Sequence, residues 1–332
     1  TPPPPTSTLE LDRRQRQMCI RDSMSGAEFV PLSLVPMVIG VCVCVACALP
    51  GNFLVLRRQA LIGDAISHVV LPGIVVAFLI TGTVATGPML LGAAGASILA
   101  VAAIEAVRRL GRIEPGAAMG VVFTAMFAAG VLLLEQSDTS SVHLDVEHAL
   151  FGNLESLIWL DATGWASLLD PQALAGVPVE LPRMAITLVV VIAFIVVFWG
   201  PLKISTFDEG FARTVGIATQ PLSLGLVIVS AIAAVAAFDA VGSIIVIAMF
   251  ICPPAAARLV TNRLEHQVLW SVVFAGLSGI VGYVLAGYGP IWMGFGSSVS
   301  AAGMIATVSG IILGLAAVFG PCTTRAGRAA DP

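Results

Sequence analysis

The chain has 332 residues, of which 58% are hydrophobic and only 11% are charged, and its formal net charge is −4. An average soluble domain has roughly 45–50% apolar and about 25% charged residues. A mean hydropathy of +0.98 excludes an ordinary soluble globule, because too few polar side chains remain to cover its surface. The composition therefore predicts a membrane protein whose apolar side chains face lipid.

The first 23 residues differ from the rest of the chain. They run from a proline cluster to an arginine-rich stretch, without the apolar core that a secretory signal peptide needs. We expect residues 1–23 to be a non-native or disordered leader, with Met24 as the natural initiator. Residues 24–322 are then expected to form one transmembrane domain, followed by a tail over 323–332.

Nine apolar segments approach the length of about 20 residues that crosses a bilayer. In chain order they cover 30–50, 61–81, 88–107, 115–134, 184–200, 221–238, 240–257, 268–288 and 299–319. The first contains Pro31 and Pro36, and only Asp239 separates the sixth segment from the seventh. Eight spans with one re-entrant segment would also fit. The sequence therefore predicts an all-α, polytopic transmembrane helix bundle of 8–9 spans.

Basic residues orient this bundle. Of the twelve that follow Met24, eleven fall in alternate connections and only Arg183 falls on the opposite side. The eleven are Arg57, Arg58, Arg108, Arg109, Arg112, Lys203, Arg213, Arg258, Arg263, Arg325 and Arg328. Because Lys and Arg accumulate on the cytoplasmic side, we expect a cytoplasmic C-terminus and a long external connection over 135–183.

The external connection is acidic. It carries eight Asp and Glu residues and no basic residue before Arg183, and its apolar stretches predict short helices against the membrane. An acidic vestibule would attract cations, although acidic residues are also simply tolerated outside. His143, Glu147 and His148 are the candidates for catching a cation on entry.

Ionisable residues inside a span are costly and usually functional. Asp64 and His68 are four residues apart near the start of the second span, so they share one helix face. A carboxylate and an imidazole one turn apart form a half-site for Zn²⁺, Mn²⁺ or Fe²⁺. A structural hydrogen bond that holds this helix against its neighbours is the alternative.

Three further features mark the spans. Pro72 with Gly73, and Pro253 with Pro254, predict helix breaks within two spans. Asp239 is a candidate pathway carboxylate, or else an external turn residue. The first span also contains three cysteines, Cys42, Cys44 and Cys47, which we interpret as small buried hydrophobes; a metal–thiolate cluster is the alternative.

The chain lacks a nucleotide-binding loop. Its single lysine is Lys203, in Pro-Leu-Lys-Ile-Ser, so no Gly-x-x-x-x-Gly-Lys-Ser/Thr sequence exists. The zinc-protease sequence His-Glu-x-x-His is also missing. We expect a protein that is not an enzyme and in which any ATP-driven work is done by a partner.

Four segments resemble, in the correct order, the membrane permeases of zinc/manganese(iron)-type ATP-binding-cassette importers. Residues 56–73 (LRRQALIGDAISHVVLPG) resemble the second-span signature of that family, and residues 150–153 (LFGN) resemble its external motif. Residues 207–216 (FDEGFARTVG) resemble the cytoplasmic segment that docks on the ATPase, and residues 241–258 resemble a late span that ends in a proline–alanine run. In this chain two prolines follow Cys252, where the family often has one.

The resemblance implies the fold of a type II importer permease in the cytoplasmic (inner) membrane of a bacterium. It also implies a homodimer, a separate ATP-binding-cassette ATPase, an external or periplasmic metal-binding protein and a transported Zn²⁺, Mn²⁺ or Fe²⁺, with no permanent cofactor and no nucleic acid. Asp64 and His68, with Asp239, would be transient ligands. Within the docking segment 203–220, the contact residues would be Phe207, Asp208, Glu209, Phe211, Arg213 and Gly216.

Two other functions remain open from the sequence. A related importer for a chelated or organic solute, such as a siderophore or cobalamin, would need a wide cavity without metal ligands. A secondary metal transporter would use an ion gradient, and such folds often show internal repeats with broken helices in both halves. The proline positions at 72 and 253 are not surrounded by a convincing repeat.

Overall fold

The computed structural model describes residues 29–59, 61–82, 86–136, 154–162, 164–292 and 299–321, and within this part of the chain it contains helices and no strands. The first half comprises a π-helical turn η1 (Val30–Leu34), α2 (Val35–Leu56), α3 (Leu61–Thr81), α4 (Thr86–Gly111) and α5 (Pro115–Gln136). The second half comprises η2 (Leu154–Ser156), η3 (Trp165–Leu169), α7 (Pro171–Ala175), α8 (Glu180–Val197), α9 (Trp199–Phe207), α10 (Glu209–Thr214), α11 (Thr219–Val241), α12 (Ser243–Val260), α13 (Leu264–Trp292) and α14 (Ala301–Phe319).

Each of the nine predicted spans corresponds to a long helix, so the predicted all-α bundle is confirmed. Eight of these helices are long and apolar enough to cross a membrane when the described residues are considered. The ninth, α3, has 21 residues, but its fully described apolar stretch Pro72–Thr81 is shorter than a span and is not among the eight. The bundle thus agrees with the prediction of eight to nine spans.

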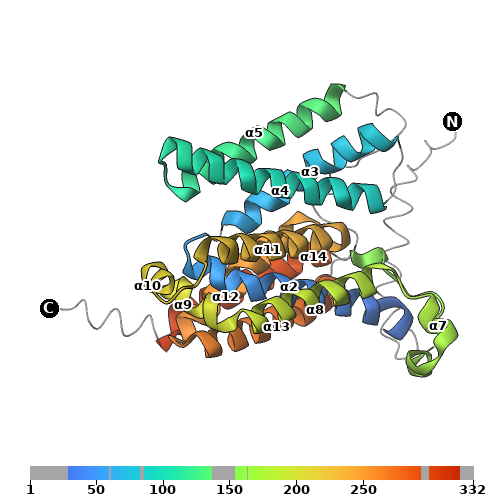
Figure 1. Ribbon diagram of the computed structural model, residues 1–332. Helices are drawn as coiled ribbons and strands as arrows, with labels where there is room; N and C mark the ends of the chain where they lie inside the picture. The colour runs from blue at the N-terminus through green and yellow to red at the C-terminus, as the bar shows by residue number, and fades with distance from the viewer. Residues whose placement is uncertain are drawn as a thin grey trace.

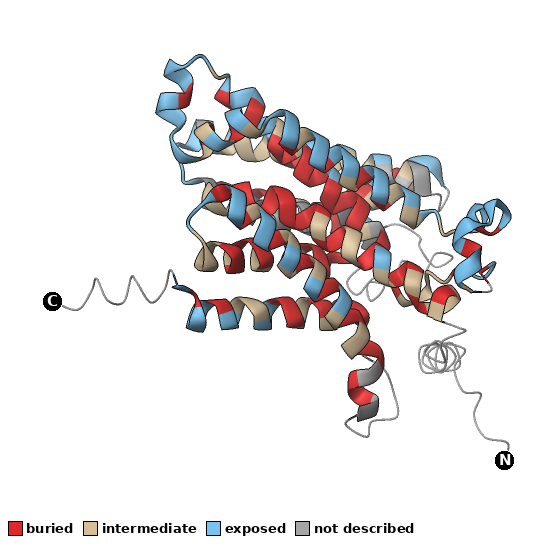
Figure 2. Ribbon diagram, turned by 90° about the horizontal axis from the view of Figure 1, so that it is seen from below, coloured by how far each residue is buried: buried red, intermediate tan, exposed pale blue. Residues whose placement is uncertain are grey.

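The helices form two groups (Figure 1). The helices α3, α4 and α5 pack on one another and make one layer, while α2 lies at the centre of the other group, in contact with α8, α11, α12 and α13. The two groups meet mainly through α11, where Val235 is buried with Ala93 of α4 and packs against Ile74 of α3. Buried residues concentrate inside the bundle and exposed residues on its outer helices (Figure 2).

Apolar side chains also cover much of the exterior. Large hydrophobic residues are exposed along α4, α5, α8 and α14, including Leu91, Leu132, Val197 and Ile311. On a soluble protein such a surface would be an aggregation hazard, whereas in a bilayer it faces hydrocarbon. The exterior thus agrees with the composition.

Inside the bundle, a buried polar group joins α2 to α13. The side-chain amide of Asn52 donates to the Ser271 hydroxyl at 2.6 Å and to the Ala48 carbonyl at 2.8 Å, and Gln267 donates to the Asn52 side-chain oxygen at 3.3 Å. All three side chains are fully buried. Interhelical hydrogen bonds of this kind hold membrane helices together where hydrophobic burial alone cannot.

The described part of the long external connection contains the short helices η2, η3 and α7, although its apolar stretch 157–160 is not helical. It is held to the bundle near η2, which contacts α2 and α14. Trp159 is only 1% exposed; its indole N–H donates to the Ala173 carbonyl at 2.8 Å, and its backbone N–H donates to the Pro31 carbonyl at 2.8 Å. Glu155 accepts a hydrogen bond from the Ala301 N–H at 2.5 Å, at the beginning of α14. The connection is therefore fixed to the first and last helices.

Replacing Trp159 by phenylalanine should loosen this connection. The change removes the indole donor, leaves the Ala173 carbonyl without that partner and leaves a small cavity, at a cost of about 1–3 kcal/mol. We expect faster proteolysis within residues 154–176. The matched control is Trp165→Phe, because Trp165 is 60% exposed; equal proteolysis of both variants would contradict the role of Trp159.

Candidate functional site

The predicted docking segment contains a short helix whose ends are specified locally. Asp208 has an extended backbone and its carboxylate accepts a hydrogen bond from the Phe211 N–H at 2.8 Å, which caps the N-terminus of α10. Gly216 has a φ of +86° and ends the helix, a conformation that glycine adopts at little cost. Capping at both ends explains why so short a helix forms between α9 and α11.

Charged residues brace α10 from within. Arg213 and Glu209 form an i,i+4 ion pair at 2.6 Å, and the Thr219 hydroxyl, at the start of α11, donates to Glu209 at 3.3 Å. Ala212 of α10 is fully buried, whereas Phe207 and Phe211 are 57% and 55% exposed. The segment thus presents two aromatic rings, one at the end of α9 and one on the braced helix α10, an arrangement suited to an anchor in a partner's groove.

Arg57 connects this segment to the centre of the bundle. It directly follows the last residue of α2, and its guanidinium donates to the Ser205 hydroxyl at 2.8 Å and to the Thr206 hydroxyl at 3.1 Å, both in α9. Burial lowers the pKa of Arg57, and the nearby Glu209 carboxylate opposes that shift. The sequence treats Arg57 only as an orienting charge, because no local pattern indicates partners almost 150 residues away.

Positions 64 and 68 lie in the first two turns of α3, one helical turn apart as predicted. The side chains of Asp64 and His68 are outside the described residues, so no contact of theirs is part of the site geometry. Helix α3 begins at the end of α2, beside Arg57, and packs on α4, α5 and α11. The pair therefore belongs to the layer formed by α3, α4 and α5.

Asp239 lies inside α11, which continues to Val241, and its side chain is also outside the described set. The sequence predicts that Asp239 separates the sixth and seventh spans, but the structure places the boundary between α11 and α12 at Gly242. The φ of Gly242 is +78°, a backbone conformation that favours glycine. Since α3 and α11 both start near the α9–α10 segment, positions 64 and 239 lie toward opposite ends of neighbouring helices (Figure 1).

The expected helix breaks are also corrected. Helix α3 continues through Pro72 and Gly73, and α12 continues through Pro253 and Pro254. Close packing surrounds the first pair. A side chain at Gly130 of α5 would meet Pro72 at 2.7 Å, and one at Gly73 would fall on the carbonyl oxygen of Gly92 in α4. Neighbouring helices thus hold the proline-containing turn in helical geometry.

Replacing Gly73 by alanine should destabilise the layer of α3, α4 and α5. The added methyl group falls on backbone rather than on a movable side chain, so the helices must separate, at about 1–3 kcal/mol or more. We expect a lower melting temperature in detergent. Gly95→Ala in α4 is the control, because nothing lies within 4 Å of a side chain there; equal melting temperatures for both variants would refute the close approach.

The remaining predicted sites are the cysteines of α2 and the residues of the external connection. Among the described side chains, no group of three His, Cys, Asp or Glu residues could hold a metal ion. Cys44 and Cys47 are fully buried in the α2 core, in keeping with small hydrophobes. His143, Glu147 and His148, and the external motif at 150–153, lie outside the described residues.

Comparison with known proteins was consistent across sequence and structure. The sequence model of the ABC 3 transport family matches residues 32–162 and 172–320. The manganese transport system membrane protein MntD of Bacillus subtilis is 38% identical over 282 residues, which cover 85% of this chain and 90% of that protein. The zinc transport system membrane protein TroD of Treponema pallidum is 35% identical over 285 residues, covering 86% and 73%.

Among solved structures, PsaBC from Streptococcus pneumoniae in complex with Fab superimposes with a TM-score of 0.69. The match covers 89% of this chain and 94% of that chain at 23% sequence identity. At this identity the similarity shows the fold, and it agrees with the helix order described above.

Proposed function

This chain belongs to the ABC 3 transport family, and from that premise we propose that it is the permease subunit of an ATP-driven importer that carries a divalent metal ion, Mn²⁺, Zn²⁺ or Fe²⁺, into the cell. The single observation that carries the proposal is the α9–α10 segment, with its two exposed phenylalanines at one end of a transmembrane bundle. The names of the two curated relatives, which specify manganese and zinc transport, support the nature of the cargo.

The distribution of charge supports a cytoplasmic position for the docking end. Helices α9 and α10 and the turn between α4 and α5 gather at this end (Figure 1). Lys203 of α9 pairs with Glu265 at the start of α13 at 2.5 Å, which brings the α12–α13 connection to the same end. Positively charged connections favour the cytoplasm, where an ATPase would be found.

The proposed assembly has two copies of this chain in the bilayer, two ATPase subunits below them and a metal-binding protein outside. These 332 residues contain no phosphate loop, and in the proposed assembly the ATPase is a separate chain. Its movement would be transmitted through α10 and α9 to Arg57 and hence to α2. Asp64 and His68 would offer weak, transient ligands, since a conducting site must also release its ion.

Metal accumulation in a bacterial strain without its own manganese and zinc importers tests this proposal. Cells would express the chain with the ATPase and binding-protein genes encoded beside it, and uptake of radioactive Mn²⁺ and Zn²⁺ would be measured. We expect uptake only when the ATPase is catalytically active. Uptake that persists with an inactive ATPase would overturn the proposal in favour of a secondary transporter, and uptake only of chelated metal would favour a chelate importer.

A further inference from the structure

A large cavity lies beside the docking segment and is not explained by metal transport. It has a volume of about 820 Å³ and lies between the ends of α2 and α4, the segment α9–α10 and the beginning of α11. Among the described residues of its wall are four arginines, Arg57, Arg58, Arg108 and Arg213, and two glutamates, Glu105 and Glu209. The excess of positive charge disfavours a divalent cation and favours an anion.

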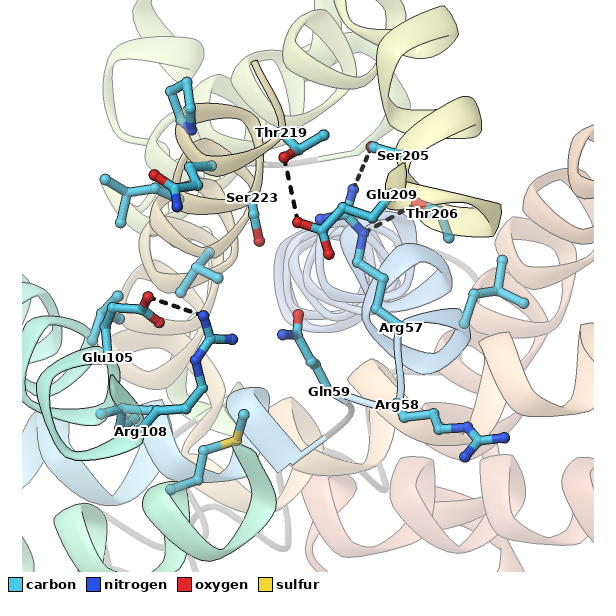
Figure 3. Close-up of a pocket in the computed structure, with 18 of the residues that line it drawn as sticks. Arg57, Arg58, Gln59, Glu105, Arg108, Ser205, Thr206, Glu209, Thr219 and Ser223 are labelled. Atoms are coloured by element: carbon cyan, nitrogen blue, oxygen red, sulfur yellow. Dashed lines mark hydrogen bonds and ion pairs between the residues drawn. The ribbon is translucent and has the colours of Figure 1, made fainter. Parts of the chain in front are cut away.

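Polar groups converge on the middle of this cavity. Figure 3 shows Gln59, Arg108 and Ser223 directed toward one central space, with Arg57 and Glu209 on its far side. Arg108 is held in place by Glu105 at 2.9 Å, and its guanidinium has further N–H donors to offer. Three different elements thus direct donors toward one small volume.

One of these groups has no partner within the described part of the chain. The side-chain oxygen of Gln59 is buried and has no hydrogen-bond partner there. Arg57 donates to two hydroxyl groups, which are neutral, while Glu209 makes its hydrogen bonds with Arg213 and Thr219. A buried acceptor without a partner is costly, so the cavity suits a ligand that combines negative charge with a hydroxyl or amine donor.

Another part of the wall is apolar. It includes Val101 and Ile104 of α4, Met119 of α5, and Leu224 and Val227 of α11. The cavity also lies at the charged end of the bundle, and basic pockets at such ends of transmembrane helices are suited to lipid head groups. A cationic region next to an apolar wall, between transmembrane helices, matches an amphiphile whose head group carries phosphate.

We propose that this cavity binds a phosphate ester, carried by the head group of an anionic membrane lipid of the phosphatidylglycerol class. Arg57 and Arg108 contact the phosphate, the Gln59 oxygen accepts a hydrogen bond from a head-group hydroxyl, and the acyl chains lie along the apolar wall. A lipid in this place contacts α2, α4 and α11 and so connects the two helix groups beside the docking segment. Its binding does not depend on whether the protein transports metal.

Native mass spectrometry of the full chain, delipidated in detergent, tests the proposal. Phosphatidylglycerol, phosphatidylcholine and inorganic phosphate would be added separately to the wild type and to Arg108→Gln. The matched control is Arg112→Gln, because Arg112 belongs to the same end of α4 but does not line the cavity. A Glu105→Gln/Arg108→Gln variant keeps the pair neutral and shows whether the altered charge at Glu105, rather than lost ligand binding, causes any effect.

We expect the wild type and Arg112→Gln to bind phosphatidylglycerol at least about tenfold more tightly than phosphatidylcholine, and both Arg108 variants to lose that preference. Lipid that binds should also raise the melting temperature of the wild type and not that of the Arg108 variants. Arg108-dependent binding of inorganic phosphate without lipid would support the phosphate site and identify the free ion as its ligand. Equal binding by all variants, for both probes, would overturn the proposal.

Discussion

Replacing Phe207 and Phe211 together by alanine should abolish metal uptake and release the ATPase from the permease. Both rings are more than half exposed on the docking segment, and in a complex they would be buried in the partner's groove. Aromatic hot spots at protein interfaces contribute about 2 kcal/mol or more each, so two of them correspond to roughly a 1000-fold loss of affinity. Co-purification of the ATPase with tagged permease measures the effect directly.

Phe319→Ala provides the control for this double variant. Phe319 is also an exposed aromatic residue, at 75%, but it ends α14 and lies outside the docking segment. Its loss should change neither uptake nor co-purification. Because the two docking phenylalanines contribute little to the core, the double variant should insert and melt like the wild type. Normal co-purification of the double variant would show that the ATPase binds elsewhere.

The short helix α10 could be predicted because its determinants are local. Asp208 caps one end of α10, Gly216 ends the other, and Glu209 and Arg213 are spaced to pair on one face. The transmembrane helices are equally local, since about 20 apolar residues in a row have no other stable conformation in lipid. These features need no knowledge of which helices are neighbours.

Other features depend on tertiary contacts and could not be predicted. Proline and glycine at 72–73 favour a break by local rules, but the close approach of Gly92 and Gly130 keeps α3 helical. Similarly, the turn between α11 and α12 was expected at the charged Asp239, whereas the backbone turns at Gly242. At 72–73, packing outweighs the local preference of proline and glycine for a helix break. At the end of α11, backbone geometry outweighs the polarity of Asp239.

The cavity beside the docking segment could not be predicted from the sequence either. Arg57 and Arg108 could be recognised only as orienting charges, because their neighbours in the cavity come from α9 and α11. The sequence indicates which end of a helix is basic, and only the fold shows that several basic ends enclose one space. The Asn52–Ser271 hydrogen bond, which joins residues 219 apart in the chain, belongs to the same class.

Asp64→Asn and His68→Ala should each lower metal uptake at least about tenfold at limiting metal concentration, with normal insertion into the membrane. Loss of one metal-binding group typically reduces affinity by about 10- to 100-fold. The two positions occupy one face at the beginning of α3, and α3 packs on α11, next to the helices that the docking segment contacts. Initial uptake rates across a range of Mn²⁺ and Zn²⁺ concentrations would separate a raised KM from a lowered maximal rate.

A purely structural role for this pair has a different signature, because bracing variants lose folded protein rather than affinity. The melting temperature of each variant should therefore stay close to that of the wild type while the KM for metal rises. His266→Ala is the control for the histidine, since His266 is exposed at the start of α13, near the docking end, and its loss should leave uptake unchanged. If Asp64→Asn and His68→Ala melt earlier but retain the wild-type KM, the pair stabilises α3 and the metal pathway lies elsewhere.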